Sequence, residues 1–187
     1  MLERIDGPSA EPLTLSEAKA FLRIDGDAED AVVAALITAA RQWVESETRR
    51  ILMLQTWRLT RDAWPPSGLI PVPLAPVRAV RAAHLVAPDG STQDVPLDLF
   101  TLGGARLPPL IAMDPARAPA PLRRVGGILL ELEMGYGASA AQVPADLLQA
   151  VRQLTAFLHE NRDAPGDQSR LPESLFALLR PYRAVRL

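Results

Sequence analysis

The side chains that could form a metal or catalytic centre are few and widely spaced. The chain has no cysteine, which excludes disulfides, thiolate metal sites and cysteine nucleophiles. Its two histidines, His84 and His159, stand far apart in the sequence. His159-Glu160 begins like the zinc-protease motif His-Glu-x-x-His, but Asp163 takes the place of the second histidine. We therefore expect His159 to complement the negative end of its own helix.

Acidic residues cluster in two places. Four of them lie at or just before the start of a predicted helix: Asp25, Asp27, Glu29 and Asp30. Their spacing lacks the central glycine and terminal glutamate of a calcium-binding loop, so it favours helix capping and a favourable interaction with the helix dipole. Farther along, Glu131 and Glu133 project from the same side of a predicted strand. Paired-acid catalysis is one interpretation of this spacing, and the alternation favours the other, a solvated strand face.

Two short glycine motifs are poorly suited to phosphate binding. Neither Gly103-Gly104 nor Gly135-Tyr136-Gly137 precedes a Lys-Ser/Thr pair or forms a strand-to-helix phosphate turn. The sequence also lacks the Gly-x-Ser-x-Gly elbow that exposes a serine nucleophile. We therefore predict no catalytic residue, no metal site and no cofactor, and we do not expect an enzyme.

Composition is that of an ordinary globular protein. The 187 residues are 48% hydrophobic and 22% charged, enough for one domain, or for one domain with a sizeable insertion. The net charge of −2 gives no indication of a protein that coats nucleic acid. We see no signal peptide, and no apolar run approaches the ~18 residues of a membrane span. We expect the protein to fold and assemble in the bacterial cytoplasm, and we expect no membrane as a partner.

Helical patterns occupy both ends of the chain. Thr14 and Glu17 form a Ser/Thr-x-x-Glu capping box, which predicts a helix over 15–24. A longer apolar stripe predicts a second helix over 28–50, with Asp27 as its N-cap. A third helix is predicted from Pro144 to near Arg162, and a short fourth helix from Pro172 to Pro181.

One ion pair is predicted within the second helix. Glu45 precedes Arg49 by four residues, which places the two side chains next to each other on one helical face. The acidic residue lies on the N-terminal side, which is the favoured order for such a pair. We therefore expect Glu45 to bind Arg49.

The middle of the chain carries strand patterns. Proline clusters, which break helices, separate short runs in which apolar and polar residues alternate. Six strands are expected, over 55–61, 77–86, 92–97, 99–102, 107–112 and 127–134. Short strands of this spacing are typical of a small antiparallel sandwich or barrel.

The order of these elements predicts an α+β fold. Two helices come first, then the strands, then two more helices. The simplest arrangement is a four-helix bundle-like domain made of residues 1–54 and 137–187. An antiparallel β sandwich or barrel module, residues 55–136, is inserted between the second and third helices. The bundle would also carry a C-terminal tail.

Candidate partner-binding residues are aromatic or lie at the C-terminus. Trp43 and Trp64 are candidates because tryptophan is enriched at binding hot spots, whereas core packing is an equally plausible role for Trp57. The tail mixes basic and apolar residues, which favours either a frayed terminus or docking onto a partner. Its candidate residues are Arg180, Tyr182, Arg183, Val185, Arg186 and Leu187.

Several segments together resemble the phage head–tail connector (adaptor, or head-completion) proteins. The resemblance begins at Leu13-Thr14-Leu15-Ser16-Glu17-Ala18-Lys19 and extends over nearly the whole chain, apart from residues 63–124. The other segments that carry it are Leu22-Arg23-Ile24-Asp25, residues 39–45, Gln55-Thr56-Trp57, Gly135-Tyr136-Gly137, residues 143–147, residues 159–162 and residues 178–183.

The resemblance implies a structural part of a long-tailed phage or a gene transfer agent. Members of that family form rings, typically dodecamers, that join the portal of a DNA-filled head to the stopper and tail. Double-stranded DNA passes through the lumen of the ring. The family has no catalytic residue to transfer to this sequence. The C-terminal tail is the expected portal contact, and the β module is expected to contact the stopper or a neighbouring copy.

Three other functions are compatible with the residues. The first is another ring of the particle neck or tail, namely a stopper or a tail terminator. The second is an enzyme whose site is built from Asp, Glu and Arg, which no motif supports. The third is a partner-binding domain outside any virus.

Overall fold

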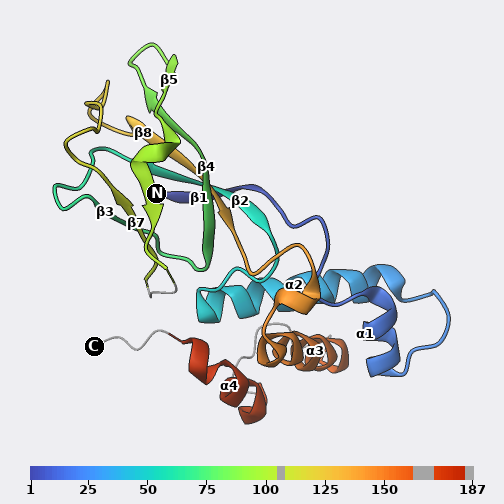
Figure 1. The fold of residues 1–187 in the computed structure, drawn as a ribbon. Coiled ribbons are helices and arrows are strands. Elements are labelled where there is room, and N and C mark those ends of the chain that lie inside the picture. Colours follow the sequence, from blue (N-terminus) through green and yellow to red (C-terminus); the bar gives the residue numbers. More distant parts are fainter. Residues whose placement is uncertain (105–107, 162–170, 184–187) are drawn as a thin grey trace. The chain divides into compact units, whose positions relative to one another are not determined.

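The chain folds into two compact units. A computed structural model describes residues 1–104, 108–161 and 171–183. One unit comprises Met1–Pro8 and Leu54–Tyr136, and the other comprises Ser9–Met53 and Gly137–Leu187. The first contains the strands and the second contains the four α-helices (Figure 1). No helix among the described residues is long and apolar enough to cross a bilayer.

The sheet unit is built around a five-stranded antiparallel sheet. Its strand order is β1-β2-β8-β4-β5. The last of these strands in chain order, β8, is therefore the central strand of the sheet and pairs with β2 on one side and β4 on the other. The strands are β1 (Leu2–Asp6), β2 (Gln55–Arg61), β8 (Ile128–Met134), β4 (Val77–Val86) and β5 (Thr92–Asp94). The predicted strands 55–61 and 77–86 are confirmed, with the same bounds.

Strand β8 supplies the centre of the core. Four alternate residues are fully buried: Ile128, Leu130, Leu132 and Met134. Glu131 lies on the opposite side, opposite Arg58 of β2. This alternation is the predicted one, and it follows from side chains of successive strand residues pointing to opposite faces.

A second, three-stranded antiparallel sheet lies in the same unit. Its order is β3-β7-β6, formed by Leu69–Pro71, Leu110–Met113 and Phe100–Leu102. Its central strand is apolar, with Ile111 fully buried. The prediction of a strand over 92–97 was too long: pairing ends at Asp94, and Leu97–Leu99 forms a 3₁₀ helix after Pro96, which cannot donate a ladder hydrogen bond.

Strand β1 and strand β3 were not predicted. Met1–Pro8 belongs to the sheet unit because Leu2–Asp6 pairs with β2, whereas the sequence placed all of 1–54 with the helices. The first residues show no apolar alternation of their own. Their strand conformation comes from hydrogen bonding to the edge of β2, which a local pattern does not reveal.

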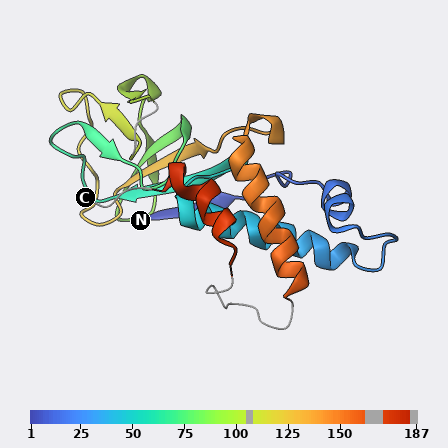
Figure 2. The same cartoon turned by 90° about the horizontal axis from the view of Figure 1, so that it is seen from below.

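The helical unit contains α1 (Leu15–Leu22), α2 (Asp30–Thr48), α3 (Ala145–Glu160) and α4 (Glu173–Leu179). Helix α3 packs against α2 and α4 (Figure 2). Helix α1 contacts both α2 and α3. Most of the buried side chains of these helices are apolar, and they include Ile37 and Val44 of α2 and Leu147 and Val151 of α3.

The helix ends confirm one predicted cap and correct another. Thr14 accepts a hydrogen bond from the N–H of Glu17, whose carboxylate bonds back to Thr14, so the capping box is confirmed. The prediction of Asp27 as the cap of α2 was wrong. Glu29 is the N-cap residue, without a side-chain cap bond, and the Asp27 carboxylate lies 3.3 Å from Lys19 Nζ.

Candidate partner-binding surfaces

A buried charge network lies inside the helical unit. Arg41, which is 2% exposed, donates from Nε to Glu11 Oε2 at 2.6 Å and from Nη1 to Glu45 Oε2 at 2.9 Å. The other Glu45 oxygen accepts the backbone N–H of Leu52 at 2.9 Å. Residues before, within and after α2 are thus joined by one guanidinium and one carboxylate.

Burial decides the electrostatics of this network. Loss of water around Glu45 raises the pKa of its carboxyl above the ordinary value, against the opposing effect of Arg41. Burial also opposes the charge of Arg41, but its bonds to Glu11 and the nearby Glu45 raise the pKa of the guanidinium. Arg41 therefore stays charged and holds both carboxylates. The predicted pair of Glu45 with Arg49 was wrong, because Glu45 turns inward to Arg41.

One C-terminal candidate, Arg183, meets one of the tryptophans, Trp43, at Phe176. The Trp43 ring packs edge-on against Phe176, with the ring centroids 6.3 Å apart. The Arg183 guanidinium lies over the same ring, 5.4 Å from its centroid, and also binds Glu47. We call Trp43, Glu47, Phe176 and Arg183 the Phe176 cluster. It fixes the chain as far as Arg183 onto α2 and α4.

The other tail candidates surround or follow this cluster. Tyr182 is half-buried, and burial together with the charge of Asp146 raises the pKa of its phenol, which Arg50 partly offsets. Arg180 is exposed. Three candidates lie outside the described residues: Val185, Arg186 and Leu187.

Trp64 packs within the sheet unit. Its indole N–H donates to the carbonyl of Pro119 at 2.8 Å, and its ring lies 6.0 Å from that of Phe100. The side chain is half-buried. In the structure, Trp64 therefore packs against residues of its own unit and stays partly exposed. A role of Trp64 in partner binding stays a prediction.

The two acidic residues of β8 each face arginines on neighbouring strands. Glu131 accepts from Arg58 at 3.0 Å, and Arg58 also lies 3.7 Å from Glu3. Glu133 accepts from Arg81 Nε at 2.7 Å. These cross-strand pairs neutralise both carboxylates, which favours a paired strand face over acid–base catalysis.

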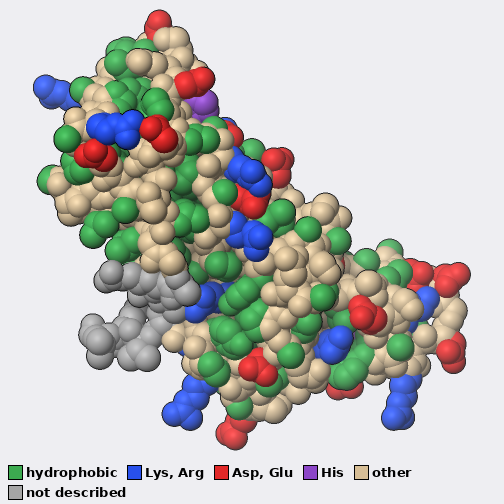
Figure 3. All heavy atoms as spheres, viewed as in Figure 1, with side chains coloured by type: hydrophobic (Ala, Val, Ile, Leu, Met, Phe, Trp, Pro, Cys, Tyr) green, Lys and Arg blue, Asp and Glu red, His purple; other side chains and the backbone are tan. Residues whose placement is uncertain are grey.

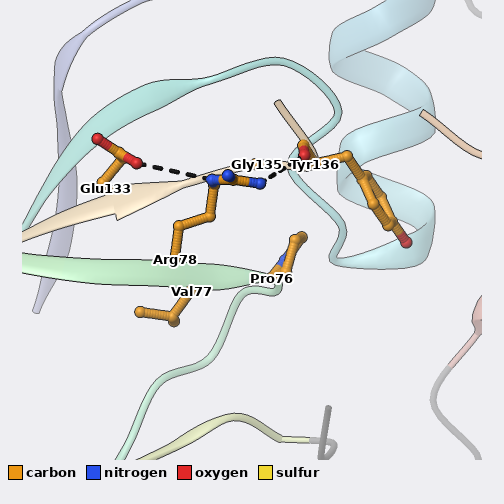
Figure 4. Close-up of a pocket in the computed structure, with 6 residues that line it drawn as sticks. All are labelled: Pro76, Val77, Arg78, Glu133, Gly135 and Tyr136. Carbon is orange, nitrogen blue, oxygen red and sulfur yellow. Dashed lines mark hydrogen bonds and ion pairs between the residues drawn. The ribbon is translucent and has the colours of Figure 1, made fainter. Parts of the chain in front are cut away.

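A shallow hollow lies at one end of this strand face. Figure 4 shows Arg78 between Glu133 and Tyr136: its guanidinium lies 3.6 Å from the carboxylate and donates to the Tyr136 carbonyl at 2.8 Å. Pro76, Val77 and Gly135 complete the wall. With its one cation and one anion already paired, the hollow has no arranged group for chemistry.

A metal-binding cluster is also missing from the part of the chain that the structure describes. No group of three or more potential ligands from His, Cys, Asp and Glu occurs among those residues. His159, in the last turn of α3, lies 2.8 Å from a Glu29 carboxylate oxygen. On the face shown in Figure 3, positive and negative side chains alternate without a large patch of either sign.

Comparison with known proteins decides what kind of protein carries these surfaces. A family model described as "Phage gp6-like head-tail connector protein" matches residues 12–84. A chain in the structure "Virion of native gene transfer agent (GTA) particle" is 30% identical with a TM-score of 0.84, and the alignment covers 100% of this chain and 97% of that chain. The chain belongs to the phage gp6-like head–tail connector family. The resemblance noted from the sequence is confirmed.

Two further structures match the whole connector chain. A chain in "Neck of empty GTA particle computed with C6 symmetry" is 29% identical, with a TM-score of 0.85. A chain in "Neck of native GTA particle computed with C12 symmetry" is 28% identical, with a TM-score of 0.82. Both alignments cover 100% of this chain and 97% of the other. No curated protein matches the chain.

The sequence signals missed the Arg41 network and the Phe176 cluster for different reasons. Arg41 occupies a position of α2 that falls on the buried side of the helix, among apolar residues. The helical periodicity of the sequence could therefore have predicted that this arginine is buried. No signal in the sequence indicated Phe176, because Trp43 and Arg183 are more than 100 residues apart in the chain. The two side chains meet at the Phe176 ring only because α4 packs on α2.

Proposed function

We propose that this connector protein is a subunit of a homo-oligomeric ring in the neck of a phage or gene transfer agent particle. The observation that carries the proposal is full-length similarity, at 30% identity, to a chain of a native gene transfer agent virion. A match to one unit alone would support only the fold of that unit. This alignment includes both units of the chain and covers almost all of the other chain.

A dodecamer is the copy number that best suits the proposal. One matched structure is a neck computed with C12 symmetry, and twelve copies satisfy that symmetry. A closed ring needs heterologous contacts, in which one surface of a subunit meets a different surface of the next. A chain with a helical unit and a separate sheet unit has two chemically different surfaces to offer.

Within the neck we propose the adaptor role. The ring would join the portal of the DNA-filled head to the stopper and tail, with its lumen as part of the DNA path. The role is structural and not enzymatic, which agrees with arginine-paired carboxylates on β8 and with the lack of a metal-ligand cluster among the described residues. We further propose that the helices form one bundle domain, into which the sheet module is inserted as a sandwich.

The portal contact is assigned to the end of the chain. Arg183 is held by Glu47 and Phe176, so residues 184–187 start from a fixed point on the helical unit. Those residues include the basic Arg186 and the apolar Val185 and Leu187. A short segment of mixed character attached to a fixed base is suited to insertion into a partner groove.

A pull-down from cells that produce the particle tests the proposal. Tagged connector protein is purified and its complexes are imaged by negative-stain microscopy. We expect portal to co-purify and to carry an additional ring. Recovery with stopper or tail-tube protein but no portal would replace the adaptor role with that of another neck ring. Recovery only with a metabolic enzyme or another non-viral complex would refute the neck assignment.

A further inference from the structure

Helix α2 has its charges paired within the helical unit and a neutral surface exposed beside them. Its exposed positions between 31 and 39 carry only alanine or valine: Ala31, Val32, Ala34, Ala35 and Ala39. The next two exposed positions are Gln42 and Ser46. Val32 is 42% exposed. An outward helical face normally carries charged and polar residues, so this face is unusual for one that meets only water.

The charged residues of α2 all have partners inside the helical unit. Asp30 binds Lys19 at 2.6 Å, and Arg41 and Glu45 bind each other at 2.9 Å. Glu47 binds Arg183. The helix therefore contains several charged residues, but none of them lies on the exposed face that carries Ala31, Val32 and Ala35. Depletion of charge from a surface that stays apolar is the composition expected at the centre of a protein interface.

The sheet unit presents an apolar tip with a positive charge. In the turn over residues 122–125, Val125 is 76% exposed and Leu122 is 43% exposed. Arg124, between them, is also exposed. Exposed apolar side chains beside an arginine resemble the anchor residues of interfaces, where arginine is enriched.

This turn is fixed in shape by its own hydrogen bonds. Arg123 donates from Nε and Nη2 to the Gly126 carbonyl at 3.1 and 2.8 Å, and the Asp62 carboxylate accepts the Gly126 N–H at 2.7 Å. Gly126 has a φ of +61°, and a Cβ on Gly127 would lie 2.4 Å from the Arg123 carbonyl oxygen. A turn held in this way loses little conformational entropy when it binds.

We propose that, in the ring, the 122–125 turn of one copy covers the neutral α2 face of the next copy. The charges support this pairing. Asp25 and Asp27 are exposed just before the face, and Asp27 shares the cation of Lys19 with Asp30, so this end of the face remains negative and complements Arg124. Valine and leucine from the turn meet small alanine side chains, which allow close approach. The contact is heterologous, as ring closure requires. The inference rests on the proposed ring and names its subunit contact.

Cysteine cross-linking tests the contact directly, because the natural chain has no cysteine. The variants are Ala35→Cys in the helix face and Val125→Cys in the turn, produced in particle-forming cells and treated with a short bismaleimide. We expect a covalent dimer from particles that contain both single variants, and none from either variant alone. The double variant A35C/V125C should give a ladder of multimers. As a matched control, T92C replaces V125C, since Thr92 is exposed on β5.

The outcomes separate failure of the contact from failure of the ring. Neck rings seen by microscopy without A35C–V125C cross-links would overturn the contact and leave the proposed function intact. Cross-links of A35C with itself would also overturn it, because they require a helix-to-helix contact. Absence of the protein from particle necks would refute the proposed function, and the contact with it.

A charge-swap experiment tests the same contact without cysteine. A35E places a charge in the neutral face, and we expect ring incorporation to fall by about tenfold or more, since an unpaired charge in an interface is strongly disfavoured. R124D should weaken incorporation through repulsion by Asp27, and D27R in the same chain should restore it. Unchanged circular dichroism shows that each variant folds. Normal incorporation of folded A35E would contradict the inference.

Discussion

Arg41 and Glu45 lie one turn apart on α2, and both are buried in the helical unit, with Nη1 and Oε2 2.9 Å apart. A buried ion pair is costly to break, because the remaining partner becomes an uncompensated charge away from water. Glu45 also holds the N–H of Leu52, and Arg41 also holds Glu11. The pair therefore ties the segments on either side of α2 to the helix.

Removal of the guanidinium should be strongly destabilising. We expect Arg41→Ala to lower the free energy of unfolding by about 3–5 kcal/mol, since Glu45 remains buried without its cation. Urea unfolding followed by circular dichroism measures the change. The matched control is Gln42→Ala, an exposed position on the same helix, which should change stability by less than about 0.5 kcal/mol.

A second variant separates loss of charge from loss of packing. Arg41→Leu combined with Glu45→Met removes both buried charges and keeps apolar volume, so we expect it to be more stable than Arg41→Ala. Glu11 is 27% exposed and can turn to water. If the double variant is less stable than Arg41→Ala, the energy lies in specific hydrogen bonds and not in an uncompensated charge.

The capping box of α1 should make stability depend on pH. Hydrogen bonds from the Thr14 hydroxyl and backbone N–H hold the pKa of Glu17 below its ordinary value of 4.5. A carboxyl with a lowered folded-state pKa stabilises the protein above the unfolded-state value, and this contribution is lost as pH falls through the folded-state pKa. Acidification below pH 4.5 should therefore remove the stabilisation that comes from Glu17.

The variant Thr14→Ala tests this coupling. We expect a loss of about 1 kcal/mol at pH 7 and a smaller loss at acidic pH, once the Glu17 carboxyl has become protonated. Denaturant unfolding at the two pH values gives the difference. Ser16→Ala, also exposed in α1, serves as the control. An equal loss at both pH values would show that the hydroxyl acts as a simple N-cap without Glu17.

Arg183 should contribute modestly to stability. The side chain is 45% exposed, so its ion pair with Glu47 and its contact with Phe176 are together worth about 1 kcal/mol. We expect Arg183→Ala to lose about that amount and Arg180→Ala to lose almost nothing, since Arg180 is exposed at a helix end. The difference should shrink in 1 M salt, measured by thermal unfolding. If the difference does not change with salt, the effect comes from the contact of Arg183 with the aromatic ring of Phe176 and not from the ion pair with Glu47.

Removal of residues 184–187 should abolish portal binding without unfolding the helices. The cut follows Arg183, so the Phe176 cluster stays complete. We expect an unchanged circular dichroism spectrum and loss of portal from the pull-down. A full-length Arg180→Ala protein controls for loss of positive charge near the tail. Normal portal recovery with the truncated chain would move the portal contact to another surface.

DNA should pass the ring without being held. The net charge is −2, and on the face of Figure 3 positive side chains alternate with negative ones. Few phosphate contacts are then available, and such contacts supply most non-specific affinity. We expect no binding at micromolar protein to a labelled duplex at about 0.15 M salt, measured by fluorescence anisotropy. Micromolar affinity there would refute this view of the lumen.

Local pattern was a good guide to elements whose cause is local. The Thr14–Glu17 box and the alternation of β8 both appear in the structure as expected, because capping and strand alternation depend on residues within one turn or one strand. Strand β1 was missed because its pairing with β2 joins residues at least 50 positions apart. Sequence reasoning offered Trp43 and Trp64 as partner-binding residues, but it did not reveal that each packs against an aromatic ring far away in the chain, Phe176 or Phe100.

The sequence by itself determined the order of the four helices, the place of the main strands between the second and third helix, the lack of any catalytic motif, and the family. It left open which partner each charge would take. Glu45 has arginines four residues away on both sides, and helical spacing allows either pair. Only the tertiary structure decided for Arg41, because burial of that face brings Glu11 and the Leu52 N–H to the same charges. Burial depends on contacts between distant segments, and local spacing does not contain them.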